Sequence, residues 1–220
     1  MPDKFPRKKF ANSKARISKL IQLLKRTHGQ TTIALKHHEP LQLLIAVILS
    51  AQCTDQQVNK VTPALFARFE SARDYARADI KEIEKFIHST GFYHNKAKSI
   101  QGACKLIVEK HGGKVPNTME ELLTLPGVAR KTANIVLYKS FGKIEGIAVD
   151  THVRRLSYRL GLTNNEDPNK IEQDLMKLIP RAYWGEITNW LIWHGRKVCF
   201  AKKPNCSGCI LNKICPSSLV

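Results

Sequence analysis

The chain has 220 residues and a formal net charge of +18 at pH 7, from 36 Lys and Arg against 18 Asp and Glu. A positive excess of this size favours a polyanionic partner, either a nucleic acid or an anionic membrane surface. The longest apolar run, residues 41–52, is too short to cross a bilayer. No apolar segment typical of a secretory signal is found near the N-terminus. These features exclude a membrane-spanning protein and predict a cytoplasmic one.

The positive charge is unevenly distributed along the chain. Residues 1–26 hold nine Lys and Arg but a single acid, Asp3. A basic, polar segment without apolar periodicity is typical of a solvated tail. We therefore expect residues 1–12 to form a disordered extension that adds non-specific affinity for phosphates.

From residue 13 onward the apolar residues recur with helical spacing. Ser13 is a candidate N-cap for a helix over 13–28, and Pro40 begins an apolar helix that reaches about Gln52. Thr54 opens the next helix with the spacing of a capping box. Further helices are expected over residues 79–90, 95–111, 118–125, 129–142, 151–161, 167–180 and 182–196. No segment has convincing strand alternation, so the sequence predicts an all-α protein.

Four of the six cysteines lie close together near the C-terminus. They have the spacing C-x6-C-x2-C-x5-C, formed by Cys199, Cys206, Cys209 and Cys215. Such a cluster in a cytoplasmic protein indicates thiolate ligands of one metal centre rather than disulfides. Zinc and a [4Fe–4S] cluster are both compatible with four thiolates. Cys53 and Cys104 lie alone in apolar stretches and are expected to be small buried hydrophobes.

The loop between the first two clustered cysteines, residues 200–205, carries Lys202 and Lys203. A basic loop held at both ends by a metal centre is suited to contact a phosphate backbone. The sequence therefore predicts that these two lysines bind a nucleic acid without reading its sequence.

The stretch "LPGVARKTAN", residues 125–134, predicts a tight hairpin between two helices. Pro126 restricts φ, and Gly127 permits a positive φ. The open backbone N–H groups at the start of the second helix can bind phosphate. Ala129 is expected to be helical already.

Lys131 lies in the first turn of that second helix, where a positive charge is unfavourable. The N-terminal end of a helix carries about half a positive charge, and the neighbouring Arg130 adds to it. Both disfavour the ammonium form and so favour a nucleophilic amine that can form a Schiff base. The alternative is an ordinary exposed lysine that contacts phosphate.

Asp150 follows the apolar residues 146–149 and precedes a predicted helix. One interpretation is an N-cap aspartate. The other is a carboxylate in an apolar cleft facing Lys131, where it stabilises a developing cation or assists proton transfer. The two roles are compatible with each other.

These motifs together resemble the endonuclease III family of helix-hairpin-helix DNA glycosylases. The resemblance rests on "LSAQCTD", "GFYHNKAKSI", "LPGVARKTAN", "AVDTHVRR", "WLIWHGR" and the cysteine pattern, and it covers about residues 13–216. It implies a six-helix barrel over 33–143 that includes the hairpin. It also implies a second lobe, from residues 13–32 and 144–220, with a [4Fe–4S] loop over 199–215.

The resemblance implies a bifunctional glycosylase and abasic-site lyase that binds duplex DNA in the cleft between the lobes. The enzyme would extrude an oxidised pyrimidine from the duplex. Lys131 would attack C1′, and β-elimination would then cut the strand, with Asp150 stabilising the cationic transition state. A nucleoid-associated monomer without a membrane partner is expected.

The resemblance also implies DNA contacts at further positions. Gln52 would fill the gap left by the extruded base, and Phe92 would wedge into the opposite strand, where the family often has leucine. The hairpin would contact the DNA backbone through Leu125, Gly127, Ala129 and Arg130.

Three alternative functions are compatible with part of this pattern. An adenine-mismatch glycosylase is disfavoured because such enzymes generally lack the lysine found at position 131. A pyrimidine-dimer or thymine-mismatch glycosylase would share the same motifs. A non-catalytic DNA-binding module with zinc would bind DNA without cleaving it.

Overall fold

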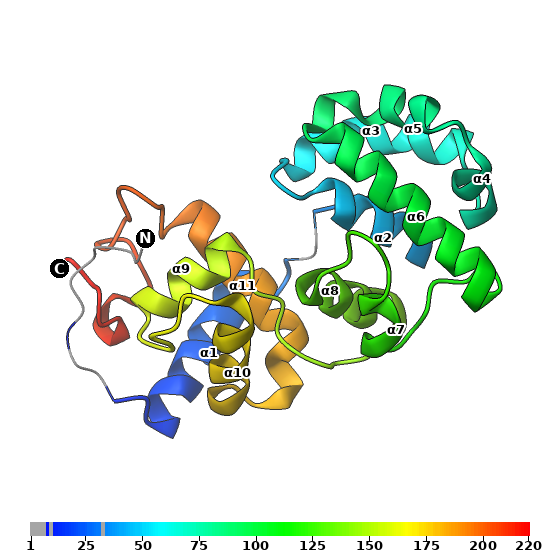
Figure 1. The fold of residues 1–220 in the computed structure, drawn as a ribbon. Coiled ribbons are helices and arrows are strands. Elements are labelled where there is room, and N and C mark those ends of the chain that lie inside the picture. Colours follow the sequence, from blue (N-terminus) through cyan, green and yellow to red (C-terminus); the bar gives the residue numbers. More distant parts are fainter. Residues whose placement is uncertain (1–7, 9–10, 32–33) are drawn as a thin grey trace. The chain divides into compact units, whose positions relative to one another are not determined.

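The computed structural model describes residues 8, 11–31 and 34–220, and within them the regular structure is helical without strands (Figure 1). The predicted all-α class is confirmed. The chain divides into two compact units. We call Ile33–Glu145 the hairpin unit, and Met1–Thr32 with Gly146–Val220 the cysteine unit. Most of the expected N-terminal extension, residues 1–7 and 9–10, lies outside the described residues.

The hairpin unit is built around one buried helix. Its elements are α2 (Pro40–Leu49), α3 (Asp55–Arg68), α4 (Ala72–Arg77), α5 (Ile80–Ile87), the 3₁₀ helix η1 (His88–Thr90), α6 (Tyr93–His111), α7 (Met119–Leu123) and α8 (Arg130–Phe141). Every residue of α2 from Leu43 to Leu49 is buried. α2 packs against α3, α6 and α8, and α6 packs against α4 and α5. This core holds the turn before α6 and the hairpin before α8.

The end of α2 differs from the prediction. The helix stops at Leu49, and Gln52 lies beyond it with φ of 51°. Thr54 caps α3 as expected by accepting a hydrogen bond from the Gln57 N–H. The Gln57 side chain donates instead to Ser89 Oγ at 2.7 Å, so the reciprocal half of a capping box is absent here.

Helix α4 is an element that the sequence analysis did not predict. It has six residues, too few for a clear apolar period, and it begins at a capping box between Ser71 and Asp74. The pKa of the Asp74 carboxyl is lowered because it accepts hydrogen bonds from the Ser71 side chain and backbone.

The cysteine unit is a second helical bundle. Its elements are α1 (Lys14–His28), α9 (Thr151–Arg159), α10 (Pro168–Leu178), the 3₁₀ helix η2 (Arg181–Tyr183), α11 (Trp184–Lys197) and the 3₁₀ helix η3 (Asn212–Ile214). α11 packs against α1 and α9, and Trp190 on it is fully buried. Ser13 caps α1, as predicted, by accepting from the Arg16 N–H.

The described residues of the N-terminal extension contact the C-terminal part of the cysteine unit. The Lys8 N–H donates to the Pro216 carbonyl at 2.9 Å, and Asn12 Nδ2 donates to the Gly161 carbonyl at 2.8 Å.

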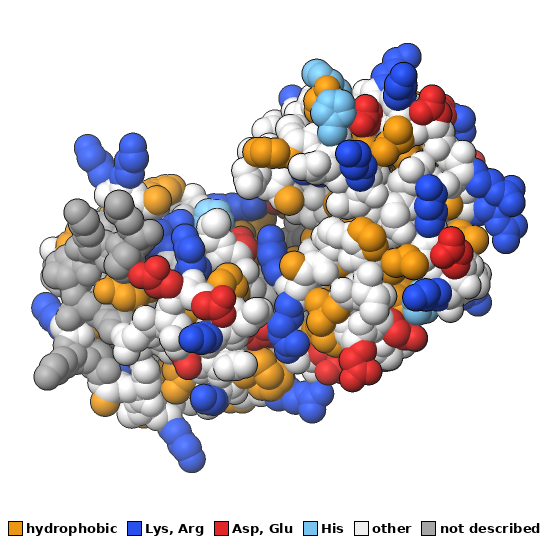
Figure 2. Space-filling view, viewed as in Figure 1, with side chains coloured by type: hydrophobic (Ala, Val, Ile, Leu, Met, Phe, Trp, Pro, Cys, Tyr) orange, Lys and Arg blue, Asp and Glu red, His pale blue; other side chains and the backbone are white. Residues whose placement is uncertain are grey.

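Lys and Arg side chains outnumber acidic ones on the visible face of each unit (Figure 2). Among the described helices, none has the length and apolarity needed to cross a membrane.

Candidate active site and metal centre

The predicted hairpin joins α7 to α8 and is packed tightly onto α6. The Val128 N–H donates to the Leu125 carbonyl at 3.1 Å, and Gly127 has the predicted positive φ, 76°. A Cβ on Gly127 would lie 2.7 Å from the Ser99 Cβ. Glycine is therefore required here both by the backbone conformation and by the close approach of α6.

Ala129 is not helical, contrary to the prediction. It is the N-cap of α8, with extended φ and ψ of −88° and 168°, because the chain is still leaving the hairpin at this residue. Alanine fits this conformation without strain. No described side chain caps α8, so the N-terminus of this helix is suited to bind an anionic ligand.

Lys131 is the second residue of α8 and is half-buried. Within the described part of the chain its ammonium takes part in no ion pair or side-chain hydrogen bond. Arg130 precedes it and is also half-buried. The Lys131 amine is thus held on a rigid element without being tied to a carboxylate, as a nucleophile must be.

Asp150 in the cysteine unit is the N-cap of α9. Its Oδ1 accepts a hydrogen bond from the Val153 N–H at 2.7 Å. The segment before it is buried, and the Ala148 carbonyl accepts a bond from the Thr188 hydroxyl at 3.0 Å. Among the described residues, Oδ2 of Asp150 accepts no hydrogen bond. The capping role is therefore present, and one carboxylate oxygen remains for a ligand.

Gln52 and Phe92 lie at the rim of one pocket in the hairpin unit. Its lining also includes Lys96, Ser99 and Gly127. Phe92 precedes α6 with a left-handed φ of 49°, and its side chain is 63% exposed. A large exposed aromatic beside an open hairpin is the kind of surface group that inserts between bases.

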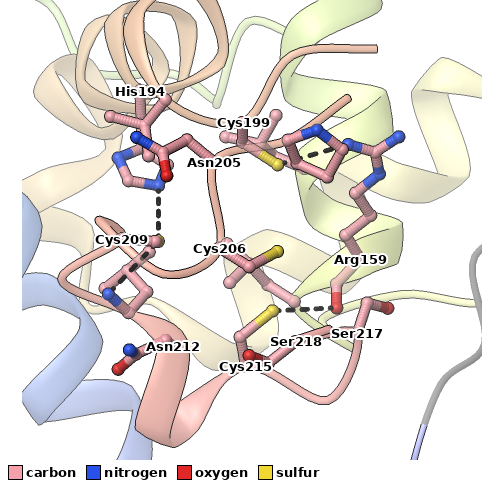
Figure 3. Close-up of a pocket in the computed structure, with 15 residues that line it drawn as sticks. Arg159, His194, Cys199, Asn205, Cys206, Cys209, Asn212, Cys215, Ser217 and Ser218 are labelled. Carbon is pink, nitrogen blue, oxygen red and sulfur yellow. Dashed lines mark hydrogen bonds between the residues drawn. The ribbon is translucent and has the colours of Figure 1, made fainter. Parts of the chain in front are cut away.

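The four clustered cysteines line one pocket of the cysteine unit (Figure 3). All four cysteines come from the loop that follows α11, and Arg159, His194 and Asn205 line the same pocket. Within the described residues, no three His, Cys, Asp or Glu side chains converge closely enough to hold a single metal ion. Four thiolates from one loop are the ligands of either a zinc ion or a [4Fe–4S] cluster.

The chemistry of the donor set also fits a metal centre. Burial raises the pKa of the Cys215 thiol to about 11 and also raises that of Cys209. Thiols of this kind are poor free nucleophiles and become thiolates when a metal binds. His194 Nε2 lies 3.4 Å from Cys209 Sγ, and burial lowers the pKa of His194 to about 4.

Two arginines of α9 hold the start of the cysteine loop, a role that was not predicted from the sequence. Arg159 is buried and donates to the carbonyls of Phe200 at 2.8 Å and Ala201 at 2.7 Å. Its Nη1 also lies 3.4 Å from Cys199 Sγ (Figure 3). Arg155 Nη2 donates to the Cys199 carbonyl at 3.0 Å. Their spacing of four residues, one helical turn, was the available signal.

The basic loop presents its lysines to solvent. Lys202 and Lys203 are both exposed. Asn205 Oδ1 accepts from the Gly208 N–H at 3.1 Å, and the Asn205 N–H donates to the Val198 carbonyl at 3.0 Å. The loop is therefore closed at its base, while its charged tip is free to meet a ligand.

Comparison with known proteins identifies the family. The family model described as HhH-GPD superfamily base excision DNA repair protein matches residues 45–181. The chain belongs to this superfamily. The matched range includes the hairpin, Lys131 and Asp150.

Several HhH-GPD relatives share most of the chain. Endonuclease III of Synechocystis sp. is 56% identical, with 96% of each chain covered, and that of Escherichia coli K12 is 36% identical over 92% of this chain and 96% of its own. A solved structure described as a trapped endonuclease III–DNA covalent intermediate has a TM-score of 0.89 at 41% identity. It covers 94% of this chain and 97% of its own.

Proposed function

We propose that this protein is a bifunctional DNA glycosylase and abasic-site lyase of base excision repair, acting on oxidised pyrimidines in duplex DNA. Family membership and the similarity to endonuclease III relatives support this enzyme class. The observation that supports the chemistry is the position of Lys131. It lies in the first turn of α8, directly after the hairpin. The solved covalent intermediate of a relative at 41% identity supports a covalent route.

In the proposed reaction, the Lys131 amine forms a bond to C1′ while the bond from C1′ to the base breaks. The base leaves with the electron pair and takes up a proton. Opening of the sugar gives an imine, which withdraws electrons so that a C2′ proton can be lost. The C3′–O bond then breaks, and hydrolysis of the imine returns the lysine.

We propose that Asp150 stabilises the cationic transition state and transfers protons. Its Oδ1 is used by the α9 N-terminus, and Oδ2 is the oxygen that we assign to this role. A carboxylate that is already oriented by its helix needs no reorganisation when positive charge develops.

We assign the DNA contacts to groups that differ in purpose. The hairpin residues Gly127, Ala129 and Arg130 and the loop residues Lys202 and Lys203 would bind phosphates and so position the duplex. Leu125 is buried and would support the hairpin from inside. Gln52 and Phe92 would enter the base stack, supported by their place at one pocket rim. A duplex substrate implies a cytoplasmic, nucleoid-associated location, which is part of the proposal.

For the metal centre, we propose a [4Fe–4S] cluster bound by Cys199, Cys206, Cys209 and Cys215. When bound, it supplies four cross-links within a loop that has little apolar core of its own. Arg159 and Arg155 would balance its negative charge, and the bonds that they make to the loop carbonyls support this assignment. The role is structural and keeps Lys202 and Lys203 in place.

The alternatives are less well supported. A solved thymine-DNA glycosylase has a TM-score of 0.81 but is only 23% identical, so it speaks for the fold alone. A binding module without catalysis would use Lys131 only to contact phosphate, and it does not account for the solved covalent intermediate of a relative at 41% identity.

The test is a borohydride trap with duplex DNA that carries one thymine glycol. Borohydride reduces the imine, and the expected result is a covalent protein–DNA band. The band should vanish with Lys131→Gln. Lys139→Gln is the matched control, because it makes the same change at the other end of α8 and should leave the band intact.

A duplex with an abasic site separates a wrong lesion from a wrong mechanism. Trapping on the abasic duplex alone would keep the lyase but overturn the proposed lesion class. Tight binding without trapping on either duplex would overturn the lysine mechanism, and an assay of base release would then distinguish a glycosylase without lyase activity from a binding module.

A further inference from the structure

Lys96 is a buried charged residue that the proposed chemistry does not use. It lies in the first turns of α6, only 5% exposed, and its Nζ donates to the Thr90 carbonyl at 2.8 Å. In the described part of the chain it forms no ion pair. Its face of α6 is otherwise apolar, with Ile100, Ala103 and Ile107 at helical spacing. An apolar side chain would fit this position at a lower desolvation cost.

The Thr90 carbonyl marks the start of the turn that presents Phe92. Thr90 ends η1, is buried, and donates its hydroxyl to the Ile87 carbonyl at 2.7 Å. The next two residues, Gly91 and Phe92, both have positive φ, 69° and 49°. The Lys96 N–H donates to the Phe92 carbonyl at 3.0 Å. One residue therefore holds the chain on both sides of the turn.

Phe92 depends on this turn for its orientation. Among the described residues it is the most exposed large aromatic side chain, and its left-handed backbone is unfavourable for a residue with a Cβ. Strain of this kind persists only where the surrounding structure imposes it. The hydrogen bond from Lys96 Nζ can hold the strained backbone in place, because it fixes the carbonyl just before the two left-handed residues.

We propose that Lys96 is a positioning residue that holds the Gly91–Phe92 turn, so that Phe92 meets the base stack as a rigid wedge. The inference rests on the proposed function, since it assumes that Phe92 enters DNA. Lys96 acts on extrusion of the base and not on the chemistry at Lys131. Lys96 lines the same pocket as Phe92 and Gln52, the two residues that we assign to the base stack.

The test uses Lys96→Met, which keeps the length of the side chain and removes the donor. Base extrusion is followed by stopped-flow fluorescence of 2-aminopurine placed beside a thymine glycol in a duplex. We expect extrusion to slow about tenfold, the scale of one strained residue that is no longer held. Borohydride trapping on an abasic duplex, where no base must leave the stack, should change less than about twofold.

A double-mutant cycle with Phe92→Ala tests the route of the effect. If Lys96 acts through the wedge, Lys96→Met should have little further effect on extrusion once Phe92 is alanine. An equal slowing in both backgrounds would overturn the proposal. An equal loss of extrusion and of abasic trapping would also overturn it, because it would indicate a merely structural role.

Two controls keep the outcome interpretable. Lys98→Met makes the same change at an exposed site on α6 and should leave extrusion unchanged. Hydrogen exchange over residues 88–95 should accelerate in Lys96→Met but not in Lys98→Met. If Lys96→Met does not fold, Lys96→Gln should give the same pattern, because its amide ends one bond short of the ammonium position and cannot keep the 2.8 Å bond to the Thr90 carbonyl. Unchanged extrusion in that variant would overturn the proposal. Failure of the proposed function would appear separately, as the absence of any trapped band in the unaltered protein.

Discussion

Gln52 and Phe92 share a left-handed backbone and line the same pocket of the hairpin unit. Their φ values are 51° and 49°, and no other non-glycine residue in the described part of the chain has a positive φ. They come from different loops, 40 positions apart. Strained backbone at two residues that we assign to the base stack indicates that function, not stability, selects these conformations.

Replacing Gln52 by glycine should separate stability from activity. Gln52→Gly relieves the strain and should raise the free energy of unfolding by about 1 kcal/mol. Gln52→Ala keeps the strain and should give no such gain. Both variants lose the inserting side chain, so excision from a duplex should fall about equally. Thermal melting and single-turnover excision check this, and a less stable glycine variant would contradict it.

Asp150 should show two separable roles. Asn is as good an N-cap as Asp, whereas Ala costs about 1 kcal/mol of stability. Asp150→Asn should therefore melt like the unaltered protein, and Asp150→Ala should melt lower. Both should lose excision by about 10²–10⁴-fold, since both lack the carboxylate. Full activity in Asp150→Asn would show that capping is the only role.

Gly127→Ala should damage the hairpin more than a comparable change elsewhere. It combines a positive φ with a Cβ 2.7 Å from the Ser99 Cβ. We expect the free energy of unfolding to fall by about 2–4 kcal/mol and DNA binding to weaken. Gly142→Ala is the control, because it has φ of 65° but open space around the added Cβ. Adding Ser99→Gly to Gly127→Ala should restore part of the loss, as measured by denaturant unfolding.

The cysteine loop should carry iron and sulfide. The purified protein should be brown, with visible absorption and about four iron atoms per chain as expected for [4Fe–4S]. Cys215→Ser should lose the colour. Arg159→Met should lose iron faster to a chelator, because the loop carbonyls of Phe200 and Ala201 lose their donor. One zinc per chain in a colourless protein would contradict the cluster.

Lys202 and Lys203 should contribute to the salt dependence of DNA binding. Each phosphate contact adds about 0.9 to the slope of log K against log salt. The double variant to alanine should therefore lower the slope by about 1.8 without changing sequence preference. Lys81→Ala with Lys85→Ala, on the exposed side of α5, is the matched control. An equal decrease of the slope in the two double variants would indicate an effect of total charge rather than a contact with phosphate.

Local features of this protein could be read from the sequence alone. The caps at Ser13 and Asp150, the positive φ at Gly127 and the start of α2 at Pro40 all appear as predicted. Each depends on a few neighbouring residues, whose backbone preferences and hydrogen bonds are the same in any context. The spacing of the four cysteines likewise brought them to one pocket.

Only the tertiary structure decided the contacts between distant segments. Arg159 meets carbonyls more than 40 positions away, and the close approach of Ser99 to Gly127 depends on how α6 packs on the hairpin. The same packing buries Lys96 and leaves Gln52 beyond its helix. These outcomes follow from the filling of space between helices, which no local pattern encodes.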